Sequence, residues 1–175
     1  MKPQKVLILH GWQANANLSW FPKAKEHLFA KGYQVFVPDL PGGYFPILED
    51  WLEIVRSYNL DENWIVIGHS LGGVTILRFL EETKKPIAQA IVVASPLEAM
   101  NFGALENFYQ TDFNWKKIKS NAESIDLIYE SDDPVVPIAN GEKLAKVLEA
   151  ELYIQSGALH LIELDLSLLD KIIKE

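Results

Sequence analysis

The chain contains no cysteine among its 175 residues. Disulfides, thiolate nucleophiles and cysteine-based zinc sites are therefore excluded. Positive charge is also scarce, because 16 Lys and Arg stand against 24 Asp and Glu and leave a net charge of −8. Phosphate binding requires clustered positive charge, so we expect no nucleic-acid partner and no binding to an anionic membrane surface.

Long hydrophobic runs are missing as well. The first run, Val6-Leu7-Ile8-Leu9, is shorter than a signal peptide requires, and no segment approaches the roughly 20 apolar residues of a membrane span. The sequence has no Gly-x-Gly-x-x-Gly after a strand, no phosphate-binding Gly-x-x-x-x-Gly-Lys pattern and no close cluster of metal ligands. We therefore expect a cytoplasmic protein with no metal and no cofactor.

The sequence does contain a regular alternation of short apolar runs with amphipathic segments. The runs predict six strands, at 6–9, 34–37, 64–67, 87–93, 125–129 and 152–154. Apolar residues spaced three and four apart predict helices at 21–28, 47–58, 71–82 and 144–148, and a last helix over 161–172. This alternation is typical of an α/β fold with a mostly parallel sheet of about six strands and helices on both faces.

We expect a single domain over residues 1–175, because no linker, repeat or low-complexity segment interrupts the pattern. Two segments fit the pattern poorly. Residues 38–46 are rich in proline and glycine, and residues 96–123 are rich in aromatics and predict a short helical or loop excursion rather than a separate cap domain. Both segments follow predicted strands, and ligands bind at the carboxyl ends of parallel strands.

The segment Gly68-His69-Ser70-Leu71-Gly72 carries the strongest chemical signal. It follows a predicted strand and begins a predicted helix, which is the setting of a serine nucleophile on a tight strand-to-helix turn. Such a turn excludes large side chains two residues before and after the serine. We therefore predict that Ser70 is the nucleophile and that the Leu71 N–H stabilises an oxyanion. The alternative is a glycine-rich turn with an incidental serine.

A serine hydroxyl is a poor nucleophile until a base takes its proton. Of the four histidines, only His160 satisfies the chain order of serine, acid and then histidine. The alternative role for His160 is capping of the last helix. Two acids, Asp132 and Asp133, follow the fifth predicted strand. Pro134 stiffens the backbone at Asp133 and favours it as the acid that orients the histidine, whereas Asp132 is suited to stabilising the turn.

A second oxyanion donor is expected from the loop His10-Gly11-Trp12 after the first strand. Gly11 permits close backbone approach, so the Trp12 N–H is the candidate donor. The Trp12 side chain either lines an acyl pocket or is simply a core or surface aromatic. The other apolar residues expected around this pocket are Tyr44, Phe45, Leu97 and Phe102. No Lys or Arg is obviously placed to hold a charged acyl group, which favours neutral substrates.

Four segments of the chain form a recognisable combination: Leu9-His10-Gly11-Trp12, Gly68-His69-Ser70-Leu71-Gly72-Gly73, Ser131-Asp132-Asp133-Pro134-Val135-Val136-Pro137 and Gly157-Ala158-Leu159-His160. Together they resemble the small cap-less serine α/β-hydrolases related to retinoblastoma-binding protein 9. The resemblance extends over nearly the whole chain. It implies a minimal α/β-hydrolase fold with esterase-type activity, a nucleophile at Ser70, an acid at Asp133 and a base at His160. The pocket-protein-binding Leu-x-Cys-x-Glu motif of the human relative has no counterpart here, since cysteine is absent.

These observations predict a carboxylesterase-like serine hydrolase. It cleaves acyl esters of small to medium neutral molecules through an acyl-enzyme on Ser70. An amidase or aminopeptidase that uses the same three residues is the nearest alternative. A hydrolase-fold protein-binding module with weak activity is an alternative from another class. Reaction of Ser70 with a fluorophosphonate distinguishes an enzyme from such a module.

Overall fold

The computed structural model describes residues 4–157 and 159–173 of the chain. Within these residues, six parallel strands form one sheet in the order β2-β1-β3-β4-β5-β6. The strands are β1 (Lys5–Leu9), β2 (Gln34–Phe36), β3 (Trp64–His69), β4 (Ile87–Val93), β5 (Ala122–Glu130) and β6 (Glu151–Gln155). The strands predicted from the apolar runs and their parallel direction are confirmed.

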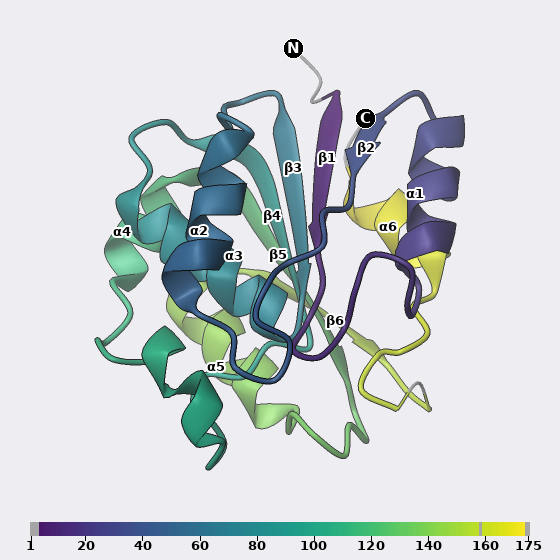
Figure 1. Ribbon diagram of the computed structural model, residues 1–175. Coiled ribbons are helices and arrows are strands. Elements are labelled where there is room, and N and C mark those ends of the chain that lie inside the picture. The colour runs from purple at the N-terminus through teal and green to yellow at the C-terminus, as the bar shows by residue number, and fades with distance from the viewer. Residues whose placement is uncertain (1–3, 158, 174–175) are drawn as a thin grey trace.

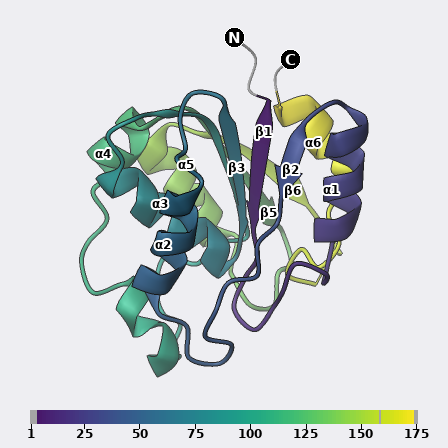
Figure 2. The same cartoon turned by 45° about the horizontal axis from the view of Figure 1, so that its top comes forward.

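Helices cover both faces of the sheet, so the molecule has three layers (Figures 1 and 2). The α-helices are α1 (Phe21–Ala30), α2 (Leu48–Ser57), α3 (Leu71–Glu82), α4 (Trp115–Ser120), α5 (Ala139–Leu148) and α6 (Leu166–Ile172). α1 and α6 lie on one face, and the other four lie on the opposite face (Figure 1). The carboxyl ends of the strands share the lower edge in Figure 1, and the loops that leave this edge carry the predicted site residues.

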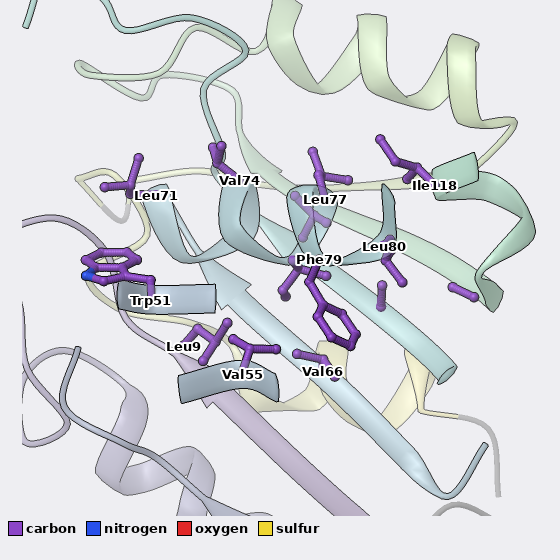
Figure 3. Close-up of a cluster of buried hydrophobic side chains, with 14 of the residues drawn as sticks. Leu9, Trp51, Val55, Val66, Leu71, Val74, Leu77, Phe79, Leu80 and Ile118 are labelled. Carbon is purple, nitrogen blue, oxygen red and sulfur yellow. The ribbon is translucent and has the colours of Figure 1, made fainter. Parts of the chain in front are cut away.

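The alternating side chains of each strand supply the two halves of the core. On β1, Val6 and Ile8 pack with α1 and α6, whereas Leu7 and Leu9 belong to the cluster beneath α2 and α3. α3 is buried along Leu71–Leu80, and its apolar side chains meet those of β1, β3 and α2 in this cluster (Figure 3). The junction between β3 and α3, where Ser70 lies, is therefore held on rigid elements.

The last helix begins later than the apolar spacing predicted. α6 starts at Leu166, because the Asp165 side chain accepts a hydrogen bond from the Ser167 N–H at 2.9 Å and caps the helix there. Leu161 has a φ of 49°, which is incompatible with a right-handed helix. Leu161 and Leu164 are nevertheless buried in the cluster beside α6. Their spacing reflects burial of a loop, which periodicity alone does not distinguish from a helix.

The segment 96–123 contains a 3-10 helix, η1 (Gly103–Phe108), and the short helix α4. Arg78 of α3 is buried and ties this segment to the core. Its guanidinium donates to the Phe108 carbonyl at 2.9 Å and to the Thr111 carbonyl at 2.6 Å, and it lies over the Phe113 ring. These contacts hold η1 beside the carboxyl edge of the sheet.

Candidate active site

Ser70 occupies a strained backbone position at the turn between β3 and α3. Its φ of 53° and ψ of −120° are rare for a residue with a side chain. The Ser70 N–H donates to the Val93 carbonyl of β4 at 2.7 Å, and the Ser70 carbonyl accepts from the Gly73 N–H at 3.0 Å. These two hydrogen bonds tie the strained residue to the neighbouring strand and to the first turn of α3.

The two glycines that flank the serine are required by the close packing of this turn. A Cβ at Gly68 would lie 2.6 Å from the backbone of Gly72, and a Cβ at Gly72 would lie 2.5 Å from the Leu9 carbonyl oxygen. Both distances are shorter than any real contact of a Cβ atom. The expectation that these positions exclude a side chain is confirmed.

A row of hydrogen bonds joins three of the predicted residues. The Ser70 Oγ lies 3.1 Å from the His160 Nε2, and the His160 Nδ1 lies 2.7 Å from the Asp133 Oδ2. A carboxylate only accepts, so the Nδ1 carries the proton and the Nε2 is left to accept from the Ser70 hydroxyl. The His160 side chain is 15% exposed, and the Asp133 side chain is fully buried.

The two competing acids occupy different environments. The Asp133 Oδ1 accepts from the backbone N–H groups of Val135 and Val136 at 2.7 and 2.8 Å. Burial by itself raises the pKa of the Asp133 carboxyl, but the hydrogen bonds from His160 and these N–H groups outweigh it and lower the pKa. Asp132 is exposed, and its Oδ1 accepts from the Gly157 N–H at 3.1 Å. The structure therefore brings Asp133, and not Asp132, to His160.

The loop after β1 lies directly against Ser70. A Cβ at Gly11 would lie 3.0 Å from the Ser70 Cβ, so the absence of a side chain permits this approach. His10 braces the loop, because its Nδ1 donates to the Gly11 carbonyl and its Nε2 accepts from the Leu40 N–H, both at 2.8 Å. Burial lowers the pKa of His10, which suits a neutral ring that both donates and accepts. The Trp12 backbone therefore follows a fixed turn beside Ser70.

A pocket of about 280 Å³ opens at Ser70 and His160. The Trp12 and Phe102 rings pack with centroids 5.0 Å apart and form part of its wall. The sequence placed these two side chains at the pocket but did not indicate most of the other lining side chains. Those side chains lie in loops at the carboxyl ends of the strands and in η1, and no regular spacing relates them. The lining residues are Trp12, Gln13, Ser70, Leu71, Pro96, Met100, Phe102, Leu105, Val135 and His160.

Three residues expected in the pocket lie elsewhere. Tyr44 and Phe45 are 68% and 77% exposed, because the turn closed by the Phe45 N–H and the Gly42 carbonyl directs their side chains to solvent. Tyr44 contacts the wall of the pocket through its backbone carbonyl, which accepts a hydrogen bond from the Trp12 Nε1 at 3.2 Å. Leu97 lines a separate hollow with Tyr109 and other residues. Their apolar character indicated that these residues lie in loops near the site, but it did not indicate where their side chains point.

His69 also belongs to the site, although the sequence pointed to a structural rather than a catalytic role for it. Its Nε2 donates to the His160 carbonyl at 2.8 Å, and its ring packs 4.9 Å from the His160 ring. Burial, with the neighbouring His160, lowers the pKa of His69 to about 4. His69 therefore stays neutral at pH 7 and holds the backbone of His160.

The low pKa of His69 predicts a loss of stability in mild acid. Unfolded His69 binds a proton below its ordinary pKa of about 6.5, whereas the native residue stays neutral until about pH 4. The free energy of unfolding therefore falls as pH drops, by about 2 kcal/mol between about pH 7 and about pH 5 from this residue. Urea unfolding of wild type and His69→Gln at the two pH values measures this difference. A wild-type pH dependence no steeper than that of His69→Gln would contradict the assignment.

Within residues 4–157 and 159–173, no group of three or more metal-ligating side chains lies together. No helix in the same part of the chain is long and apolar enough to cross a membrane.

Several known proteins are similar to this chain in sequence and in fold. A family model described as serine hydrolase matches residues 6–165. The putative hydrolase YdeN of Bacillus subtilis is 35% identical over 166 residues, which cover 91% of this chain and 87% of YdeN. The serine hydrolase RBBP9 of Rattus norvegicus is 30% identical over 147 residues, which cover 82% of this chain and 74% of that protein.

The crystal structure of the ydeN gene product from B. subtilis superposes with a TM-score of 0.86 at 33% identity. It covers 90% of this chain, which in turn covers 88% of that one. The expected α/β-hydrolase fold and the resemblance to the relatives of retinoblastoma-binding protein 9 are both confirmed. Because the family model matches residues 6–165 and both relatives are at least 30% identical, the chain belongs to the serine hydrolase family.

Proposed function

We propose that this serine hydrolase cleaves carboxylic esters of small to medium neutral acyl groups through an acyl-enzyme on Ser70. The observation that carries the proposal is the hydrogen-bonded row of Ser70, His160 and Asp133 at the mouth of an apolar pocket. One domain without a cap carries the activity, and residues 96–123 supply only part of the pocket wall.

Each of the three residues has one chemical role in this proposal. The Ser70 Oγ attacks the ester carbonyl carbon while the His160 Nε2 takes the hydroxyl proton. Asp133 holds the proton on the Nδ1 and stabilises the imidazolium. The tetrahedral intermediate then collapses, the bond to the leaving oxygen breaks, and His160 returns the proton to the departing alcohol. Water attacks the acyl-serine by the same proton path and releases the acid.

The oxyanion of the intermediate is held by two backbone N–H groups, those of Trp12 and Leu71. Leu71 is the first residue of α3, so its N–H is free of an intrahelical acceptor and lies at the positive end of the helix dipole. Trp12 follows Gly11, the residue whose missing side chain lets this loop approach Ser70. Donors fixed in this way need no reorganisation when negative charge develops.

The pocket supports a neutral acyl group. Among the described residues that line it, none is Lys, Arg, Asp or Glu, so an anionic or cationic acyl group would be desolvated without a partner. Its volume of about 280 Å³ is near the lower end of the range for small-molecule sites, about 300–1,000 Å³. A short aliphatic acyl chain fits this space and gains from burial.

A matched set of p-nitrophenyl esters tests the substrate class. We expect kcat/KM to rise from acetate to butanoate, because each buried methylene contributes about 0.8 kcal/mol, and to fall for hexadecanoate. The hemisuccinate has a chain similar in length to that of butanoate but ends in a carboxylate, and it should react at least about tenfold more slowly. Preference for the hemisuccinate would refute the neutral acyl site, and faster cleavage of the butanoyl anilide than of the ester would favour an amidase.

A further inference from the structure

The loop that carries His160 has a backbone that side chains normally avoid. Leu159, His160 and Leu161 have φ values of 49°, 67° and 49°, so three consecutive residues other than glycine lie in the left-handed region. Each such residue costs free energy, because its Cβ crowds the backbone. A run of three therefore requires a strong contact elsewhere in the protein to hold it.

Glu130, the last residue of β5, supplies that contact. Its side chain is buried, with the residue 1% exposed. The Glu130 Oε1 accepts from the Leu159 N–H at 2.9 Å, and the Oε2 accepts from the N–H groups of His160 and Leu161 at 2.7 and 3.1 Å. Successive N–H groups in such a turn form a concave site for an anion. The carboxylate fills this site with charge-assisted hydrogen bonds, which offset the backbone strain.

The contact with Glu130 completes the restraint of His160. The His160 carbonyl accepts from His69, and the two ring nitrogens face Asp133 and Ser70. Glu130 and Asp133 leave the same strand end three residues apart, so one carboxylate holds the imidazole and the other holds the peptide that bears it. The position of the Nε2 relative to the Ser70 Oγ therefore depends on both.

We propose that Glu130 is a positioning residue, whose carboxylate places the His160 imidazole for proton transfer from Ser70. The inference rests on the role of His160 in the proposed function. Glu130 acts through the backbone of His160 and does not touch the substrate pocket. A glutamine at this position keeps the size but has one accepting oxygen and one NH₂ group, which would face a backbone N–H as donor against donor.

The test compares Glu130→Gln with Glu123→Gln, which removes an exposed carboxylate from the other end of the same strand. We expect Glu130→Gln to lower kcat for p-nitrophenyl butanoate about 10- to 100-fold, because a displacement near 1 Å costs on this order. KM should change less than about threefold. Rates are expressed per site titrated to completion with a fluorophosphonate, so loss of folded protein alone leaves kcat unchanged. A folded Glu130→Gln with kcat within about twofold of wild type would overturn the inference.

A second pair of variants covers the case in which Glu130→Gln does not fold. Leu159 is 68% exposed and strained, so Leu159→Gly relieves strain without opening the core. The double variant Leu159→Gly, Glu130→Gln is then compared with Leu159→Gly alone. We expect kcat to be at least about tenfold lower in the double variant, and equal values would reject the role of Glu130.

The outcomes separate this inference from the proposed function. If Ser70→Ala retains activity, the acyl-enzyme proposal fails whatever Glu130 does. If Ser70→Ala is inactive while Glu130→Gln and the double variant are fully active, the proposed function stands and only the role of Glu130 is rejected.

Discussion

Ser70→Ala is expected to lower the turnover of a neutral ester by on the order of 10⁴- to 10⁶-fold, because Ser70 alone carries a hydroxyl among the described residues that line the pocket. The fold should persist. The substitution removes only the small hydroxyl, whose hydrogen bond is to His160. The strained backbone at Ser70 is held by backbone hydrogen bonds, which the substitution leaves in place. The measurement is kcat on p-nitrophenyl butanoate, with circular dichroism and thermal unfolding as checks on the fold.

A matched control is Ser57→Ala, which removes an exposed hydroxyl at the end of α2. Covalent labelling with a fluorophosphonate provides a second readout, since it requires an activated serine rather than any particular ester. Labelling should be strong in wild type and in Ser57→Ala and absent in Ser70→Ala. If Ser70→Ala retained turnover within about tenfold of wild type, the acyl-enzyme mechanism would be wrong. A folded wild type that does not label would favour the binding-module alternative.

Asp133→Asn is expected to lower turnover by on the order of 10³-fold or more. The reason lies in the two oxygens of the carboxylate. The Oδ1 accepts from the N–H groups of Val135 and Val136, so an asparagine places its oxygen there and turns its NH₂ toward His160. That NH₂ donates to the Nδ1 and moves the imidazole proton to the Nε2, which then no longer accepts the proton of Ser70.

Asp132→Asn is the matched control for this substitution. Asp132 is exposed and accepts from the Gly157 N–H, and an asparagine oxygen keeps that hydrogen bond. We expect turnover to stay within about tenfold of wild type. Rates of both variants on one ester, with unfolding curves for each, make the comparison. A larger loss in Asp132→Asn than in Asp133→Asn would reassign the acid while leaving Ser70 and His160 in place.

The order of strands and helices was predictable because it depends on short-range patterns. Apolar runs such as Ile87–Val93 and three-four spacing in α2 depend on neighbours within one element. The error at the start of α6 has the same origin, because Leu161 and Leu164 are buried like helix residues but lie in a loop. A pattern of apolar residues predicts which side chains face the core. It predicts the backbone conformation only where that segment forms the regular hydrogen bonds of a helix or strand.

At the candidate site, the sequence alone was sufficient to predict the tight turn around Ser70. Gly68 and Gly72 lie within two residues of the serine, and the steric exclusion of their side chains is a property of that local backbone. The tertiary structure decided which distant groups meet there. Asp133 reaches His160 because β5 and β6 are neighbours in the sheet, and Tyr44 and Phe45 miss the pocket because of one turn. No sequence motif marks Glu130, because its partners are backbone N–H groups, which every sequence contains. Only the folded chain brings these groups to the Glu130 carboxylate.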